Sequence, residues 1–185
     1  RLRDMIQQMV GAADRIVNEA QPIVDTRLPD GSRVNIVLQP VSLDGSCISI
    51  RKFCGIPMNL AYLVQSEAIS EEAAELLKLL VKAGYNIFIS GGTGSGKTTF
   101  LNALSEYIPE GERVITIEDS AELQLNNIKN LVRLETRPAN GQGAQEISIR
   151  DLIRTALRMR PDRIIVGEVR GAEALDMLQA IICTL

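Results

Sequence analysis

Residues 91–98 have the residue types and the spacing of a phosphate-binding loop. They read Gly-Gly-Thr-Gly-Ser-Gly-Lys-Thr, which matches the pattern G-x-x-x-x-G-K-[ST]. Glycines reach backbone conformations closed to other residues, so successive amides can turn inward around the β-phosphate of a nucleotide. Lys97 would then reach the β- and γ-phosphates, and the Thr98 hydroxyl would ligate Mg²⁺. The predicted nucleotide-binding set is Gly92, Thr93, Gly94, Ser95, Gly96, Lys97, Thr98 and Thr99.

The residues on either side of this loop predict the elements that must position it. Residues 85–90 read Tyr-Asn-Ile-Phe-Ile-Ser, which predicts a buried strand leading into the loop. Residues 99–107 predict a helix that Pro109 ends, and the positive N-terminal end of this helix would face the same phosphates. The alternative is a glycine-rich turn that matches the pattern by chance. The order of strand, loop and helix argues against that alternative.

Acidic residues directly follow two further predicted strands. Glu118 and Asp119 follow a strand at 114–117, and Glu168 comes after a strand at 163–166. Ligands bind at the carboxyl ends of strands in a parallel sheet, so we expect these acids to face the phosphate loop. There they would hold Mg²⁺ and orient or deprotonate an attacking water; the alternative for such acids is an ordinary helix N-cap. The predicted metal set is Thr98, Glu118 and Glu168.

The composition of the 185 residues predicts a cytoplasmic enzyme. A hydrophobic content of 45% is enough for a sizeable core. The net charge of -3 argues against a surface built on overall positive charge, so we expect no nucleic acid as a partner. No apolar run approaches the ~18 residues of a membrane span, and the N-terminus has no signal-peptide pattern. Three cysteines without C-x-x-C spacing, in a chain without histidine, predict reduced thiols and no zinc site.

The first 54 residues predict a small α+β domain. Apolar residues at helical spacing predict one amphipathic helix over about the first 19 residues. Short strand-like runs follow, and turn signals such as Pro29-Asp30-Gly31-Ser32 separate them. The predicted strands are 23–28, 34–38 and 47–50.

Residues 55–69 predict a linker, and residues 70–185 predict a RecA-like P-loop NTPase core. A helix at 70–83, closed by Gly84, is followed by alternating strands and helices, the pattern of a parallel sheet covered by helices. The predicted fold class is therefore α/β, with a small α+β domain in front of the core. Such a core normally has further strands, so we expect a core truncated at its C-terminus. The remaining predicted segments are a strand at 131–136, a loop at 138–144 and a helix at 148–160.

Three motifs of this chain resemble those of the type II/type IV secretion ATPases, and they follow one another along the chain as in that family. The run Arg-Ile-Ile-Val-Gly-Glu-Val-Arg at 163–170 resembles that family's atypical Walker B motif, with Gly-Glu where many phosphate-loop enzymes carry an Asp. Ile117-Glu118-Asp119 resembles the family's Asp box, and residues 91–98 resemble its Walker A motif. Residues 24–35 and 48–53 are most similar to the CpaF-type ATPases of tight-adherence (Flp) pilus assembly, although conjugation-type relatives carry similar strings.

The resemblance implies a hexameric cytoplasmic motor, peripheral to the inner membrane, that hydrolyses ATP with Mg²⁺ to drive pilus assembly or secretion. Its partners would be ATP or ADP, further copies of the chain, and inner-membrane platform proteins. Glu118 and Glu168 would act on the catalytic water and the metal. Arginines of the N-terminal domain would reach the γ-phosphate, and the family's His box has no counterpart because the chain contains no histidine. The candidate arginines are Arg27, Arg33 and Arg51.

Other functions compete with the motor. A GTP-dependent switch would need an Asn-Lys-x-Asp string, which the chain lacks. A module that binds ATP to change shape without hydrolysing it stays open, although Glu118 and Glu168 would then have no evident task. For the arginines, the alternative is an ordinary solvated side chain on an exposed strand beside a turn.

Overall fold

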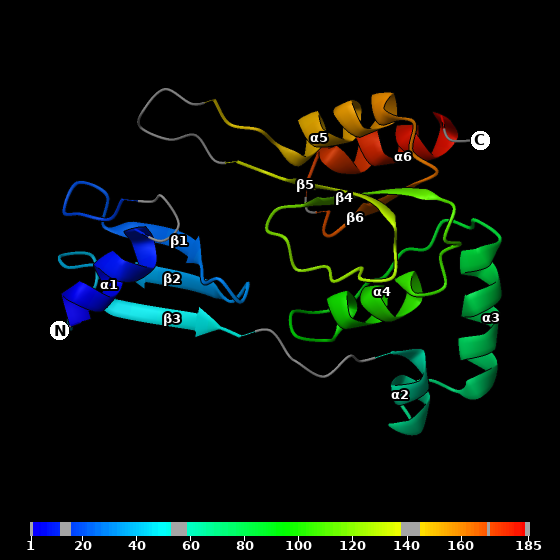
Figure 1. The fold of residues 1–185 in the computed structure, drawn as a ribbon, viewed down its shortest axis with the longest axis horizontal. Coiled ribbons are helices and arrows are strands. Elements are labelled where there is room, and N and C mark those ends of the chain that lie inside the picture. Colours follow the sequence, from blue (N-terminus) through cyan, green and yellow to red (C-terminus); the bar gives the residue numbers. More distant parts are fainter. Residues whose placement is uncertain (1, 12–15, 53–58, 138–144, 170, 184–185) are drawn as a thin grey trace. The chain divides into compact units, whose positions relative to one another are not determined.

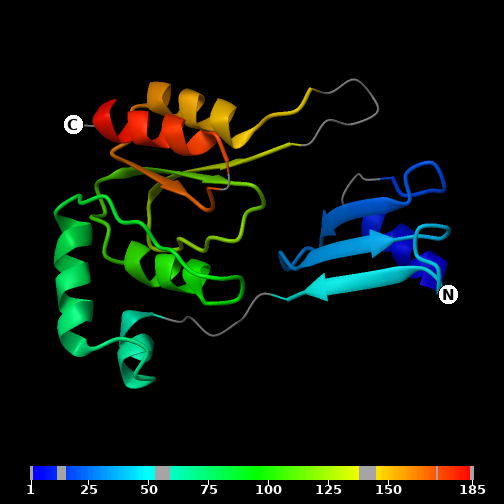
Figure 2. The ribbon, with the colours of Figure 1, turned by 180° about the vertical axis from the view of Figure 1, so that it is seen from behind.

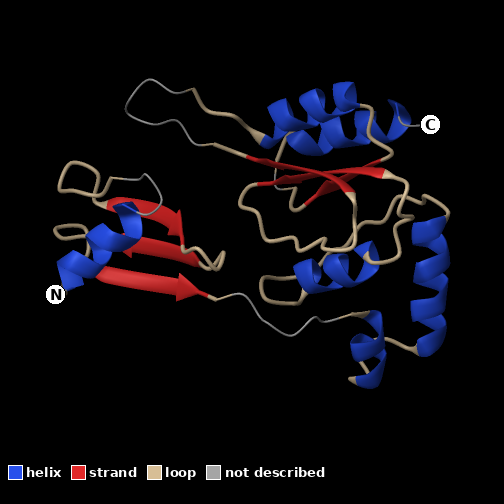
Figure 3. Ribbon diagram, viewed as in Figure 1, coloured by secondary structure: helices blue, strands red, loops and turns tan. Residues whose placement is uncertain are grey.

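The computed structural model describes residues 2–11, 16–52, 59–137, 145–169 and 171–183, and it divides into two compact units. Unit 1 is Arg1–Pro57 and unit 2 is Met58–Leu185. Figure 1 labels the elements, and Figure 3 separates helices from strands. In chain order the elements are α1 (Leu2–Gly11), β1 (Ile23–Arg27), β2 (Arg33–Val37), β3 (Cys47–Arg51), α2 (Leu60–Gln65), α3 (Glu71–Lys82), α4 (Lys97–Ser105), β4 (Arg113–Glu118), β5 (Asn130–Glu135), α5 (Ile149–Ala156), the 3₁₀ turn η1 (Leu157–Met159), β6 (Arg163–Val166) and α6 (Glu173–Cys183).

Unit 1 is an antiparallel sheet with one helix packed against it. The strand order is β1-β2-β3, and the three strands predicted from the sequence are all present within one or two residues. The turn between β1 and β2 forms at the predicted position, where Asp30 accepts hydrogen bonds from the backbone and hydroxyl of Ser32. The core of this unit joins α1 to alternate residues of β2; its fully buried members are Ile6, Val10, Val17, Val34 and Ile36.

The prediction of one helix over the first 19 residues is wrong in length. Helix α1 ends at Gly11, and residues 16–20 are not helical. The Asn18 side chain accepts hydrogen bonds from the backbone of Ala20 and Gln21 (both 2.9 Å), so a local turn competes with the helix there. Val17 is nevertheless buried in the same core cluster, which explains why an apolar residue stands at this position.

Unit 2 contains the predicted parallel sheet, with strand order β5-β4-β6. Both neighbours run parallel to β4, with Ile117 opposite Leu134 on one side and Val166 on the other. Central strand β4 is fully buried from Val114 to Glu118. This burial on both faces is expected for a parallel strand between two helical layers. Strand β4 is therefore the central, packed element of the unit.

The two faces of this sheet carry different helices. Ile115 and Ile117 pack with Ile153 of α5 and Ala180 of α6, whereas Val114 faces a separate cluster that contains Leu101 of α4. Figures 1 and 2 show the same layering from opposite sides, with α5 and α6 on one face and α4 on the other. No described helix combines the length and the apolar character needed to span a bilayer.

The strand predicted at residues 85–90 is not formed. This segment belongs to neither sheet, and Tyr85 and Phe88 are 65% and 63% exposed. Its alternation is still used, because Ile87 and Ile89 are half-buried against the cluster formed by α2, α3 and α4. The residue types favour a strand, but a strand also needs a neighbour to complete its hydrogen bonds, and the described sheet offers none at this position.

Helix ends in unit 2 follow the sequence closely. Helix α3 begins after Ser70, whose hydroxyl accepts from the Ala73 amide, and it ends in a Schellman motif closed by Gly84. Ser148 and Asp151 form the capping box of α5, and the end of the helix predicted at 148–160 tightens into η1. The loop predicted at 138–144 lies outside the described residues, as does Cys54; Cys47 is an exposed free thiol.

Two element boundaries differ from the sequence prediction. Helix α2 lies within the segment predicted as a linker at 55–69, because Leu60 is buried against Val81 and Leu104. Helix α4 starts at Lys97 and ends at Ser105, two residues earlier at each end than the predicted 99–107. The earlier start puts Lys97 and Thr98 in the first helical turn.

The capping box of α5 gives a testable dependence of stability on pH. Hydrogen bonds from the side chain and backbone of Ser148 lower the pKa of Asp151. Because the folded-state pKa lies below the unfolded value, the stabilisation is present above the unfolded pKa and is lost as pH falls through the folded one. The difference in denaturation midpoint between the parent and Asp151→Asn should therefore be clear at pH 7 and shrink below the ordinary Asp value of about 3.9. Asp44→Asn is the matched control, and a difference that grows with acidity would contradict the assignment.

Candidate nucleotide-binding site

The phosphate-binding loop is an exposed turn that ends in the first residue of α4. Gly94 and Gly96 have φ angles of 76° and 88°, in the left-handed region that other residues rarely adopt. Gly96 stands at the N-cap of α4 and provides no side-chain hydrogen bond to the first turn. The amides of that turn are therefore available to an anion, which the positive end of the helix also attracts.

Lys97 lies along the loop and closes it. Its Nζ donates to the carbonyl oxygens of Gly91 (2.9 Å) and Gly92 (2.7 Å). The ammonium is thus held at the mouth of the loop, where a phosphate group would compete with two carbonyls for its protons. This position is compatible with the predicted contact of Lys97 with phosphate. In the free loop, Lys97 also stabilises the turn through its two hydrogen bonds.

The segment after β4 brings a further acid to α4. Oγ1 of Thr98 lies 3.4 Å from Oε2 of Glu122, at the limit of a hydrogen bond. The Gln124 amide donates to Oδ1 of Asn102 (3.0 Å), which joins the same two segments one helical turn further along. The sequence interpretation missed Glu122 because it considered only acids that immediately follow a strand. The available signal was a third acid four residues after Glu118.

Glu118 is the last residue of β4, and its side chain is 3% exposed. Its Oε2 accepts two backbone hydrogen bonds, from Glu122 (2.6 Å) and Leu123 (2.8 Å). Its Oε1 is buried without a hydrogen-bond partner among the described residues. Glu118 was predicted to act on water and metal, whereas the structure gives its carboxylate backbone amides as partners.

Residues of β5 and the residue after it hold the segment that follows β4. The Thr136 hydroxyl donates to the carbonyl oxygen (3.0 Å) and the carboxylate (2.7 Å) of Asp119. Arg133 donates from Nη2 to the carbonyl oxygen of Leu123 (3.1 Å). No described helix begins directly after Asp119, and its carboxylate accepts from the hydroxyl of the residue that follows β5.

Glu168 lies two residues beyond β6 at the same end of the sheet. Val166 is opposite Ile117, and the Gly167 amide donates to the Ile117 carbonyl (2.8 Å), so the chain leaves β6 directly beside Glu118. The Glu168 side chain is half-buried. Glu118 and Glu168 therefore follow neighbouring strands at the same end of the sheet, and that they face the phosphate loop stays a prediction.

The three predicted arginines lie in unit 1 and form a row across its sheet. Arg27 is directly opposite Arg33, and Arg33 is directly opposite Arg51. Directly opposite residues project from the same face, so the three side chains share one face of the sheet. Val34 and Ile36 point to the α1 side, which places the arginine row on the face away from α1.

The oxygen donors at α4 fit Mg²⁺. Mg²⁺ bound with nucleotides is held by one or two protein oxygens together with phosphates and waters. The Thr98 hydroxyl and Glu122 carboxylate supply two such oxygens close together, and Glu168 comes from the neighbouring strand end. No group of three or more His, Cys, Asp or Glu that could hold a metal by itself occurs in the described part of the chain. The donor set therefore suits a metal that arrives with phosphates.

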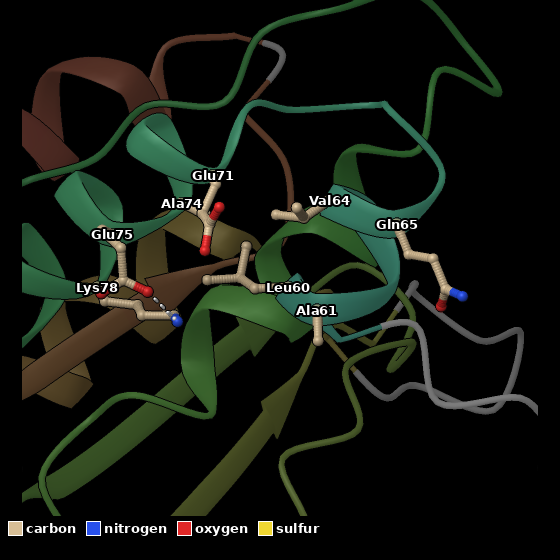
Figure 4. A pocket seen from close by; sticks show the side chains of 8 residues that line it. All are labelled: Leu60, Ala61, Val64, Gln65, Glu71, Ala74, Glu75 and Lys78. Carbon is tan, nitrogen blue, oxygen red and sulfur yellow. Dashed lines mark hydrogen bonds and ion pairs between the residues drawn. The ribbon is translucent and has the colours of Figure 1, made fainter.

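A hollow of about 280 Å³ lies elsewhere in unit 2, between α2 and α3. Figure 4 shows its lining side chains, including the hydrogen bond from Lys78 to Glu75 (2.6 Å) that raises the pKa of Lys78. None of its lining residues belongs to the phosphate loop, β4 or β6, so it says nothing about nucleotide binding. The lining residues are Leu60, Ala61, Val64, Gln65, Glu71, Ala74, Glu75 and Lys78.

The sequence of this chain matches that of a known protein family. The family described as "Type II/IV secretion system protein" matches residues 1–183. The chain belongs to this family. The family-level resemblance seen in the sequence motifs is thereby confirmed, and the CpaF-type assignment stays a prediction.

Several relatives lie in type IV secretion and conjugation. PtlH, the type IV secretion system protein of Bordetella pertussis, is 39% identical over 189 residues, which cover 90% of this chain and 56% of PtlH. The conjugal transfer protein TrbB of Rhizobium radiobacter is 34% identical over 95% of this chain and 53% of TrbB. This chain therefore spans about half the length of these two relatives.

Solved structures support the predicted fold class. The VirB11 ATPase of the Brucella suis type IV secretion system is 29% identical, with a TM-score of 0.51, over 97% of this chain and 60% of VirB11. The parallel sheet of unit 2 and the small antiparallel sheet of unit 1 agree with the prediction of a RecA-like P-loop core behind a small α+β domain.

Removing the Lys97 ammonium should abolish nucleotide binding. We expect Lys97→Ala to lose the rise in melting temperature that ADP or ATP with Mg²⁺ gives the parent, because the loop loses the side-chain cation that faces the phosphates. Differential scanning fluorimetry measures this rise. Lys129→Ala is the matched control, since Lys129 is an exposed lysine paired with Glu110. A parental rise in Lys97→Ala would remove the loop as the binding site.

Proposed function

We propose that the intact protein is an ATP-hydrolysing motor subunit of a type II/IV secretion or pilus assembly system. The observation that carries the proposal is the contact between the Thr98 hydroxyl, in the first turn of α4, and the Glu122 carboxylate from the segment after β4. This contact joins the phosphate-binding end of α4 to the acid-bearing end of the sheet, which is the arrangement that phosphoryl transfer needs. Family membership and the VirB11 likeness support the same activity.

Each group of the site has a separate task in this mechanism. The loop amides and Lys97 bind the β- and γ-phosphates, with Gly92 to Thr99 around them. Bound Mg²⁺ would neutralise charge that develops on the phosphate oxygens. Thr98 and Glu122 would hold the metal through their side-chain oxygens. Glu168 accepts a proton from the attacking water, because it lies at the adjacent strand end and no strand separates it from Glu118.

The arginine row of unit 1 would complete the site. Unit 1 contains no phosphate loop, yet three guanidinium groups share one face of its sheet at one end. An arginine donates paired hydrogen bonds to phosphate oxygens and stays charged at any working pH. We propose that Arg33 and Arg51, followed by Arg27, contact the γ-phosphate of the bound nucleotide.

The cellular system is the finer part of the proposal. Residues 24–35 and 48–53 favour a CpaF-type motor for Flp pilus assembly, with a hexameric ring at the cytoplasmic side of the inner membrane and platform proteins as partners. A conjugation-type ATPase of type IV secretion is the second candidate, because PtlH and TrbB are similar to this chain. Identifying the genes beside the coding sequence would separate them: pilin and platform genes favour the first, and mating-pore genes the second.

Glu168→Gln should separate binding from hydrolysis in the intact protein. The amide preserves the shape of the side chain but cannot accept the proton, so we expect turnover to fall by a factor of about 100 or more. The nucleotide-induced rise in melting temperature should remain. Glu110→Gln, at an exposed glutamate, is the control for the substitution. Equal ATPase rates in Glu168→Gln and parent would assign the proton transfer to another acid. A parent that binds ATP without turnover would favour the module that binds ATP to change shape without hydrolysing it.

Replacing the arginine row should lower turnover without blocking nucleotide binding. We expect Arg33→Ala with Arg51→Ala to reduce the ATPase rate of the intact protein by a factor of about 10 or more, since these groups stabilise charge in the transition state. ADP binding to the loop should persist. Arg3→Ala, at an exposed arginine of α1, is the matched control. Unchanged turnover in the double variant would exclude these arginines from a role at the γ-phosphate.

A further inference from the structure

We propose that Glu118 is a positioning residue, which directs Glu122 toward Thr98 and does not itself act on water or metal. This inference rests on the proposed function for its catalytic meaning, but its structural content stands on the contacts of the carboxylate alone. It replaces the direct role that the motif assigned to Glu118, and it makes Glu122 the acid of this segment that faces the nucleotide.

The hydrogen bonds of the Glu118 carboxylate leave neither of its oxygens directed at a bound nucleotide or water. A carboxylate oxygen offers about two lone-pair sites, and Oε2 of Glu118 uses both on the amides of Glu122 and Leu123. The other oxygen, Oε1, is enclosed and has no hydrogen-bond partner among the described residues. With the side chain 3% exposed, neither oxygen is presented to an attacking water in this conformation.

The bonded amides belong to the residue that faces α4. Glu118 binds the Glu122 amide, and the side chain of the same Glu122 approaches Thr98. The segment is also tied at Asp119 by Thr136, at Leu123 by Arg133 and at Gln124 by Asn102. These bonds fix the path of the segment on both sides of Glu122, so the orientation of Glu122 depends on the buried carboxylate beneath it.

The glycine after β6 packs directly against Glu118. A Cβ atom added at Gly167 would lie 3.0 Å from Cγ of Glu118, which is closer than nine in ten real Cβ contacts. Glu118 has little room to give way, because its Oε2 is held by two amides. The Glu118 side chain thus also sets how closely the backbone before Glu168 approaches β4.

Amide exchange tests the structural half of the inference without any nucleotide. In the free protein, the exchange of the Glu122 and Leu123 amides should speed up by a factor of about 10 or more in Glu118→Ala, because both lose their acceptor. Glu118→Gln keeps one acceptor oxygen and should protect both amides nearly as well as the parent. Unchanged exchange at both amides in a folded Glu118→Ala protein would overturn the inference. Because nucleotide is absent, this outcome is independent of the proposed function.

A double-mutant cycle tests the functional half. We measure how the ADP-induced rise in melting temperature depends on Mg²⁺ concentration in Glu118→Ala, Glu122→Ala and the double variant. Both single variants should need about 10-fold more Mg²⁺ than the parent, as for the loss of an orienting partner of a metal ligand. The double variant should need no more than Glu122→Ala, since Glu118 acts through Glu122. Glu118→Gln should recover most of the parental dependence, and Glu110→Ala should match the parent.

The outcomes that contradict the inference differ from those that contradict the function. Additive effects in the double variant, or a Glu118→Gln protein as impaired as Glu118→Ala, would give Glu118 a direct role and overturn positioning. Gly167→Ala offers a second route when Glu118→Ala does not fold, because it displaces the Glu118 stem and should also raise the Mg²⁺ requirement. A parent without any nucleotide-dependent rise would refute the proposed nucleotide site, while the amide-exchange result would still decide whether Glu118 holds the segment.

Discussion

The two hydrogen bonds that Glu118 accepts from the amides of Glu122 and Leu123 determine the path of the chain after β4. A buried carboxylate is costly unless its charge is hydrogen-bonded, and each bond to a charged acceptor contributes about 1.5–3 kcal/mol. The carboxylate can therefore be accommodated here only if the following segment turns back over the end of the strand. That turn carries Glu122 to the first helical turn of α4, so the geometry of the candidate site follows from one buried side chain.

The rigidity of β4 makes this arrangement dependable. The strand is buried on both faces, with Ile115 and Ile117 against α5 and α6 and Val114 against the α4 side. Because close-packed interiors resist displacement, the position of Glu118 is fixed relative to α4 and β6 alike. Glu118 therefore takes its position from a strand that its hydrophobic neighbours hold in place. Glu122 takes its position from the segment whose amides Glu118 binds.

The sheet of unit 1 shows a different use of register. Antiparallel pairing aligns Arg27, Arg33 and Arg51 in one row, although like charges directly opposite one another destabilise a sheet. The register of the antiparallel pairs therefore gathers three guanidinium groups on one face of this sheet.

Local chemistry in the sequence determined much of this protein. The glycine pattern of the phosphate loop, the caps at Ser70 and Ser148, the turn at Asp30 and the runs that form β4, β5 and β6 are properties of a few neighbouring residues, so they could be predicted. The sequence also identified the family. Residues 85–90 have the side chains of a strand, but strand formation requires a partner that sequence alone does not provide, and the structure leaves them unpaired.

Only the tertiary structure decided which acids do what. Glu118, Asp119 and Glu122 are close in sequence and have similar chemistry, yet the first is buried on backbone amides, the second accepts from Thr136, and the third approaches Thr98. The alignment of the three arginines likewise depends on strand register, which brings together residues up to 24 positions apart, as for Arg27 and Arg51 on either side of Arg33. Burial and hydrogen-bond partners are properties of the packed chain, and they separate residues that the sequence alone makes equivalent.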